Sequence, residues 1–270
     1  MKRTVAIIFV MLILLSLNAC IVKESNTSSA ETSRTKDKTN TVVSVMYKCP
    51  SKNNDYIYEF NENGITLVKY IGKDTEISVP QTIDNVYITE IGNECFSQNQ
   101  NIVSVEIPHC VRTVGSYAFY NCKNLNSVII KEGVEKIASS AFDGCTSLKD
   151  VSFPSSVKEI GFCAFSNCTS LDTISFIGKR PLSIGASAFS YTPVSKVVLP
   201  EGTESISNAA FTHCKKLKEV YVPESVKEIK SNAFKNSPKV VLYIHEGSYG
   251  VIFAKTSGEN YKILKGETIL

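Results

Sequence analysis

The stretch IGFCAFSNCTSLDTISF, from Ile160 to Phe176, contains the pattern that decides the fold of this 270-residue chain. An isoleucine stands five residues before Phe165 and an alanine immediately before it. A cysteine follows three residues later and a leucine six residues later. The stretch ends in a run whose apolar and polar side chains alternate, as expected of a short β-strand.

The same arrangement recurs along the chain, with steps of 23, 23, 23, 24, 22 and 23 residues between phenylalanines. The seven positions are Phe96, Phe119, Phe142, Phe165, Phe189, Phe211 and Phe234. A fixed period in this range predicts a solenoid, in which stacked coils bury equivalent columns against one another. We expect about seven 23-residue coils, each with short parallel strands. We also expect a single helical or 3-10 turn at the Ala-Phe pair and a tight turn permitted by Gly161.

These columns resemble the BspA-type leucine-rich repeat family, whose units read I-G-x-x-A-F-x-x-C-x-x-L-x-x-V-x-I-P. The resemblance covers roughly Thr75 to Tyr243 and extends over seven registers. It implies a leucine-rich repeat solenoid of the right-handed β/α superhelix type. The chain departs from the pattern in the proline and glycine columns, at Lys131, Ile177, Ala138, Ser207 and Lys230.

Both ends of a solenoid need covers, because a bare coil would present strand edges and apolar surface. Alternating runs around Asn63-Gly64 predict a hairpin, so we assign residues 45–74 to an N-terminal cap. The repeats occupy residues 75–245. Residues 246–270 form a C-terminal cap, with a helix from Ser248 to Thr256 and a strand from Tyr261 to Leu264.

The first 44 residues differ from the rest. Lys2 and Arg3 precede an apolar run of thirteen residues, which suits a signal peptide and is too short to span a bilayer. The following LNAC resembles the bacterial lipobox. The resemblance implies a signal peptide over residues 1–19 and a lipid on Cys20. An ordinary secretory signal cleaved nearby is the competing interpretation. Residues 20–44 are rich in Ser, Thr and charge, so we expect a disordered tether.

The cysteine column decides which chemistry is available. Three residues after each phenylalanine stand Asn99, Cys122, Cys145, Cys168, Thr192, Cys214 and Ser237. All these residues are small and able to hydrogen-bond, which favours inert packing over nucleophiles or metal ligands. The spacing of neighbouring strands would also fit disulfides, although stacked side chains that point the same way favour packing. Cys110 and Cys163 fall outside the column, and we expect them to be partly exposed.

We therefore expect no catalytic residues, no metal site and no cofactor, because the cysteines lack zinc spacing and an oriented histidine partner. The formal charge of +3 falls to +1 once Lys2 and Arg3 are removed. A near-neutral chain predicts no binding to nucleic acid. We expect a monomer, lipid-anchored and exposed on the surface of a bacterial cell envelope.

The remaining function is binding, and the family resemblance implies adhesion or contact with an extracellular protein. Outward positions of the repeated strand provide candidate ligand residues. These are Ile129, Val198 and Tyr221, with Lys196 and Glu219 in the neighbouring row. Apolar and aromatic groups on a polar face often anchor interfaces, but they also favour strand conformation. Two hypotheses compete with protein binding: glycan binding as part of a surface polysaccharide system, and a purely structural role in the envelope.

Overall fold

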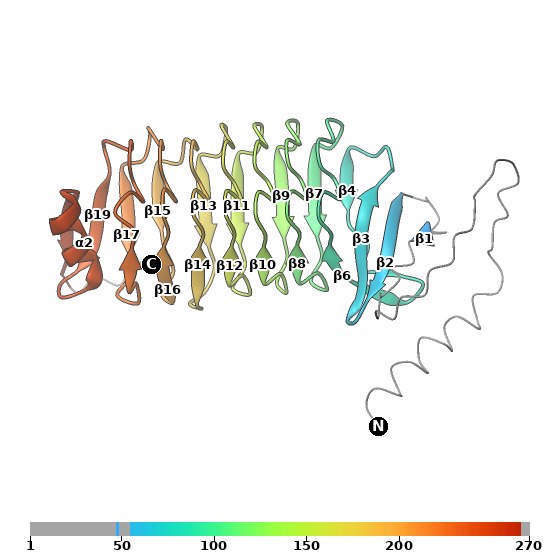
Figure 1. Cartoon of the computed structure of the whole chain (residues 1–270), viewed down its shortest axis with the longest axis horizontal. Helices are drawn as coiled ribbons and strands as arrows, with labels where there is room; N and C mark the ends of the chain where they lie inside the picture. Colours follow the sequence, from blue (N-terminus) through green and yellow to red (C-terminus); the bar gives the residue numbers. More distant parts are fainter. Residues whose placement is uncertain (1–46, 49–54, 266–270) are drawn as a thin grey trace, which may run out of the picture. The chain divides into compact units, whose positions relative to one another are not determined.

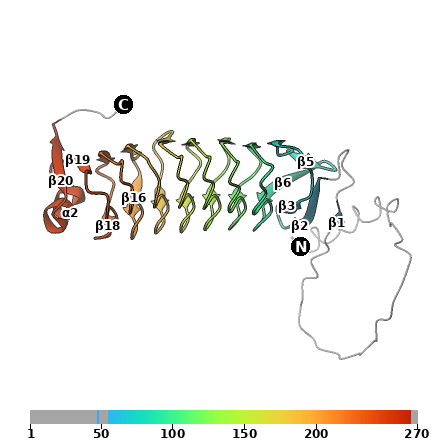
Figure 2. The same ribbon diagram turned by 90° about the horizontal axis from the view of Figure 1, so that it is seen from above.

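The computed structural model describes residues 47–48 and 55–265. The predicted signal peptide, Cys20 and the predicted tether lie outside the described residues. Residues 55–265 form a stack of coils with two parallel-strand walls (Figure 1 and Figure 2). Each repeat contributes one strand to each wall, so the predicted solenoid is confirmed.

The first wall is a ladder of paired strands in which the β-branched residues that stand five positions before each repeat phenylalanine lie in register. Ile91 pairs with Val114, and the same column continues through Ile137 to Ile229. Its strands are β6 (Val86–Ile91), β8 (Thr113–Val114), β10 (Lys136–Ile137), β12 (Glu159–Ile160), β14 (Leu182–Ile184), β16 (Thr203–Ile206) and β18 (Glu228–Ile229). A short strand, β5 (Thr82–Ile83), pairs antiparallel with β6.

The second wall carries the predicted strands of alternating apolar and polar residues that follow each repeat phenylalanine, and it consists of three groups of paired strands. The first is β4 (Glu76–Ser78), β7 (Ser104–Ile107) and β9 (Ser127–Ile130). The second is β11 (Asp150–Phe153) and β13 (Thr173–Phe176). The third is β15 (Lys196–Val198), β17 (Glu219–Val222), β19 (Val241–His245) and β20 (Asn260–Leu264). Within the described residues this wall has nine strands, so the stack has about nine turns rather than seven.

A stack of phenylalanine rings fills the interior between the walls. All seven repeat phenylalanines are buried, and successive rings are nearly parallel. Centroid separations run from 4.7 Å between Phe96 and Phe119 to 5.8 Å between Phe211 and Phe234. Each ring contacts the rings of the coils above and below it, so the cohesion of the solenoid is a sum over neighbouring coils.

The Ala-Phe segment forms consecutive turns rather than a continuous helical or 3-10 turn. Bonds from residue i+3 back to residue i are present, as from Cys145 N–H to the Phe142 carbonyl. Residues on both sides of the phenylalanine have positive φ and interrupt the helix, as at Ser140 (54°) and Gly144 (76°). Gly161 has no positive φ. A Cβ there would lie 2.8 Å from backbone atoms of the preceding coil, so this glycine serves close packing between coils.

The two ends extend the coil stack as well as cover it. At the front, β2 (Tyr56–Asn61) and β3 (Gly64–Tyr70) form an antiparallel hairpin, and β3 also pairs in parallel with β6. The two-residue strand β1 (Tyr47–Lys48) pairs with β2. At the back, α2 (Tyr249–Ser257) packs on the last coil through Phe253, which meets Phe234 edge-on. The final strand, β20, pairs in parallel with β19. In the second wall, neither β4 nor β20 follows a repeat phenylalanine, which explains the low predicted turn count.

Candidate functional site

The cysteine column lies inside the solenoid, beside the phenylalanine stack. Cys122, Cys145 and Cys168 are fully buried, and each Sγ donates a hydrogen bond of 3.1 Å to a phenylalanine carbonyl of the preceding coil. Ser237 makes the equivalent bond to the Phe211 carbonyl at 2.8 Å. Thr192 instead donates to the carbonyl of Phe189 in its own coil. The column therefore links coils through small polar groups.

Burial makes these thiols unreactive. It raises the pKa of Cys214 to about 11 and that of Cys122 to about 12. For Cys145 and Cys168, burial moves the thiol pKa still further above its usual range. Because the thiolate is the nucleophile and the metal ligand, these residues are poor candidates for either role.

All cysteines within residues 55–265 are free thiols. Cys110 and Cys163 are partly exposed, as predicted. The Sγ of Cys110 donates to the Gln81 carbonyl at 3.4 Å. Burial still raises the pKa of both thiols, so partial exposure does not make them activated cysteines.

The predicted ligand residues lie on the outward face of the second wall, but they do not form one group. Ile129, on β9, is 47% exposed. The strands β11 and β13, with outward Ser152 and Ser175, separate it from Val198 on β15. Val198 pairs with Tyr221 on β17, and both side chains are half-buried. Ile129 is thus isolated from the other candidates.

Lys196, Glu219 and Tyr221 contact one another. The Lys196 Nζ lies 3.9 Å from Glu219 Oε2 and 4.8 Å from the centroid of the Tyr221 ring. Their register places Lys196 opposite Glu219 on the neighbouring strand. The ammonium group therefore has both a carboxylate and an aromatic face beside it.

Two residues that sequence reasoning missed extend this group toward the C-terminal end. Tyr243, on β19, stacks on Tyr221 with ring centroids 4.4 Å apart and an interplanar angle of 11°. Lys262, on β20, lies with its Nζ 5.5 Å from the centroid of the Tyr243 ring. We call Lys196, Tyr221, Tyr243 and Lys262 the Lys–Tyr ladder. The alternation in VVLYIH placed Tyr243 in the outward row, whereas Lys262 has no repeat motif to mark it.

Two hollows lie at the N-terminal end. A shallow groove of about 850 Å³ runs between the β2–β3 hairpin tip and the first wall. It is lined by exposed Tyr87 with Asn61, Glu90, His109 and Arg112. A smaller cavity of about 240 Å³ lies between the hairpin and β4.

This fold defines a leucine-rich repeat protein. The profile of the BspA type leucine rich repeat region matches residues 89–183 and 182–250 in six copies, so the chain belongs to that family. A search among curated proteins finds no match. No helix within residues 55–265 has the length and apolar character needed to cross a membrane.

Several solved structures are similar to this chain, and the T. pallidum protein has the same fold. The T. pallidum leucine-rich repeat protein TpLRR is 23% identical, with a TM-score of 0.52 over 80% of this chain and 98% of that one. A leucine-rich repeat protein from Bacteroides capillosus is 29% identical, with a TM-score of 0.41 over 46% of this chain and 95% of that one. A leucine rich cell surface protein from Faecalibacterium prausnitzii is 18% identical, with a TM-score of 0.39 over 76% and 96%.

Proposed function

We propose that the protein is a lipid-anchored, surface-displayed binding protein that contacts an extracellular protein through the Lys–Tyr ladder. The observation that carries the proposal is the stacking of Tyr221 on Tyr243 across two neighbouring outward strands. The stack is flanked on one side by Lys196 and on the other by Lys262.

Pre-ordered aromatic side chains suit an interface. Tyrosine is enriched among residues that dominate binding energy, and a ring already held by its neighbour loses less conformational freedom when a partner arrives. The flanking ammonium groups favour a partner that presents carboxylates beside an apolar contact. Elsewhere on the predicted outward row, β7, β11 and β13 present the polar residues Glu106, Ser152 and Ser175. Ile129 on β9 is exposed but is isolated from the other apolar candidates, so it offers no comparable stacked anchor.

A comparison of variants tests the binding surface. We expect the full chain to capture a protein from a panel of purified extracellular and matrix proteins. The double variant Tyr221→Ser/Tyr243→Ser should lose at least about tenfold in affinity, as expected when two aromatic anchors are removed. The matched control Ser152→Ala/Ser175→Ala changes the same outward row and should bind as the wild type does. Equal binding by both variants would exclude the ladder as the contact surface.

Anchoring rests on the sequence around Cys20, LNAC preceded by an apolar run. Two acyl chains would hold the protein at a membrane, since each buried methylene contributes about 0.8 kcal/mol. Growth of the producing cells with an alkynyl fatty acid should label the wild type and Cys110→Ser but not Cys20→Ser. Retained label in Cys20→Ser would contradict the proposal.

A second candidate is glycan binding in the groove beside Tyr87. This side chain is 57% exposed and stands among amide, carboxylate and guanidinium groups that could hydrogen-bond sugar hydroxyls. A glycan array separates the two functions. Glycan binding lost in Tyr87→Ala and kept in Tyr221→Ser/Tyr243→Ser favours the groove.

A further inference from the structure

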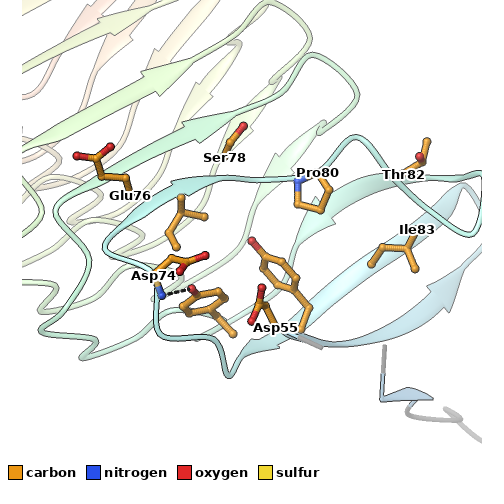
Figure 3. Close-up of a pocket in the computed structure, with 10 residues that line it drawn as sticks. Asp55, Asp74, Glu76, Ser78, Pro80, Thr82 and Ile83 are labelled. Carbon is orange, nitrogen blue, oxygen red and sulfur yellow. Dashed lines mark hydrogen bonds between the residues drawn. The ribbon is translucent and has the colours of Figure 1, made fainter. Parts of the chain in front are cut away.

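The cavity between the front hairpin and β4 has the composition of a site for an organic cation. Its walls combine apolar side chains, among them Ile77, Pro80 and Ile83, with the rings of Tyr56 and Tyr70. Figure 3 shows the labelled Asp55 and Asp74 extending toward the same space, whereas Glu76 points away from it.

Tyr56 contributes a hydroxyl group that has no hydrogen-bond partner among the described residues. Its side chain is only 6% exposed and lines the cavity. Within residues 55–265, its hydroxyl makes no hydrogen bond. The neighbouring Tyr70 hydroxyl accepts a bond of 3.0 Å from the Asp74 backbone N–H (Figure 3). Because no fully buried polar side-chain atom of the described residues lacks a partner, this hydroxyl is reachable from the cavity and is open to a polar ligand there.

The carboxylates of Asp55 and Asp74 also have no neutralising partner among the described residues. No ion pair within the described part of the chain involves Asp55 or Asp74. Burial is the main reason why the pKa of both tyrosine hydroxyls is raised, and the negative charge of Asp55 and Asp74 adds to it. The cavity is therefore lined by neutral tyrosines and unneutralised carboxylates, an arrangement that attracts positive charge.

Gly72 keeps the space between these groups open. A Cβ at this position would lie 2.5 Å from the Tyr70 hydroxyl oxygen and 2.7 Å from Asp55 Oδ1. The two oxygens therefore converge over a backbone that has no side chain. The rings of Tyr56 and Tyr70, with centroids 5.2 Å apart and tilted by 56°, supply aromatic faces beside them.

We propose that this cavity binds an alkylammonium group, with Asp55, Asp74 and the Tyr56 hydroxyl accepting its three hydrogen bonds. The apolar walls would contact the alkyl stem, and the tyrosine rings would add cation–π attraction. The chemistry fits a lysine side chain of a protein or a free alkyl diamine. The site lies at the opposite end of the stack from the Lys–Tyr ladder, and the proposal goes beyond the function proposed above.

Isothermal titration calorimetry on the full chain tests the site, with Nα-acetyl-lysine amide and cadaverine as probes. Nα-acetyl-norleucine amide is the neutral control of similar shape. We expect saturable binding of at least one amine and at least about tenfold weaker binding of the norleucine probe. Tighter binding of the lysine amide identifies a protein lysine as the source, and tighter binding of cadaverine identifies a small amine. Equal binding of the norleucine probe, or no binding of either amine, would overturn the proposal.

Variants then locate the site. Asp55→Asn/Asp74→Asn should weaken amine binding at least tenfold, and Tyr56→Phe should weaken it severalfold. Glu76→Gln removes a carboxylate that points away and should bind within twofold of the wild type. Tyr221→Ser/Tyr243→Ser should also leave amine binding unchanged, so failure of this site and failure of the ladder are distinguishable. A loss in Glu76→Gln as large as that in Asp55→Asn/Asp74→Asn would contradict the assignment.

Discussion

The interior columns and the outward Lys–Tyr ladder both consist of side chains stacked coil upon coil, yet they differ in how strictly they repeat. The phenylalanine column has the same residue in all seven repeats, and every one of these side chains is buried. The outward row changes from Glu106 to Ile129, Ser152 and then Tyr221. Interior positions are constrained by close packing in every coil, whereas outward positions are not.

The difference separates residues that hold the coils together from residues that give this chain its own surface. A buried ring contributes through its area and its two neighbours, so substitution there should be costly. A partly exposed ring such as Tyr243 contributes less to stability and remains available to a partner. The following predictions test this separation, in order of decreasing effect.

Thiol labelling should give the largest contrast. At pH 8 we expect Cys122, Cys145, Cys168 and Cys214 to react on the order of 10³-fold more slowly than Cys110 and Cys163. The buried thiols need an opening of the coil stack before they can react, and their thiolates are suppressed by raised pKa values. Timed alkylation followed by peptide mass spectrometry measures the rates. Fast labelling of these four buried cysteines in the native protein would indicate that they are reactive, contrary to the prediction.

Removing one ring from the middle of the stack should have the largest effect on stability. Phe142 is fully buried between Phe119 and Phe165, so Phe142→Ala should cost about 3–5 kcal/mol. The outward control Ile129→Ala should cost less than about 1 kcal/mol, because its side chain is half-exposed. Chemical denaturation monitored by circular dichroism measures both. Similar losses in the two variants would contradict the separation of interior from surface.

The interior was predictable from sequence because each buried position recurs in every coil and requires a residue of similar size and polarity each time. Seven phenylalanines in register located the stack, and the mixture of Cys145 with Thr192 and Ser237 identified a packing column. The turn conformation was not predictable in the same way. Serine rarely adopts a positive φ, so the sequence gives no sign that Ser140 does so. The turn there is imposed by the packing of the neighbouring coils.

The side chains of the two proposed surface sites were only partly predictable. Tyr221 and Lys196 were found because they occupy repeat columns, and Tyr243 follows in the same register. Lys262 lies in a strand without the motif, so only the parallel pairing of β20 with β19 brings it to Tyr243. The cavity with Asp55 arises where a hairpin meets the first coil. Such a junction occurs once and gives no periodic signal.

Replacing Cys145 should sharpen the description of the column. Cys145→Ser should cost no more than about 1 kcal/mol, because the column already accepts Ser237 with an equivalent bond. Cys145→Val should cost about 1–3 kcal/mol, since a branched side chain overpacks a buried position and removes the donor. Denaturation midpoints of the two variants provide the comparison. A valine variant as stable as the serine variant would show that the hydrogen bond and the small size are unimportant.

We expect the smallest loss of stability when an exposed ion pair beside the first wall is removed. Glu135 lies 2.6 Å from the Lys158 Nζ and 3.6 Å from an Arg112 Nη1, and its side chain is 41% exposed. The hydrogen bond and charge of Lys158 lower the pKa of Glu135 below its ordinary value of 4.5, with a smaller contribution from Arg112. Exposed pairs are strongly screened, so Glu135→Gln should cost only about 0.2–1 kcal/mol at pH 7.

The pH dependence of that cost has a definite sign. Because the carboxyl pKa is lowered on folding, its stabilisation is present above the unfolded value near 4.5 and is lost as pH falls through the lower folded value. The difference in unfolding free energy between wild type and Glu135→Gln should therefore be constant from pH 7 to about 5 and vanish in more acidic solution. Denaturation series at several pH values, at low salt and in about 1 M NaCl, measure it. A difference that persists unchanged in acid would mean that Glu135 stabilises the fold through packing rather than through charge. The exposed ion pairs would then contribute to stability in the same way as the buried interior columns.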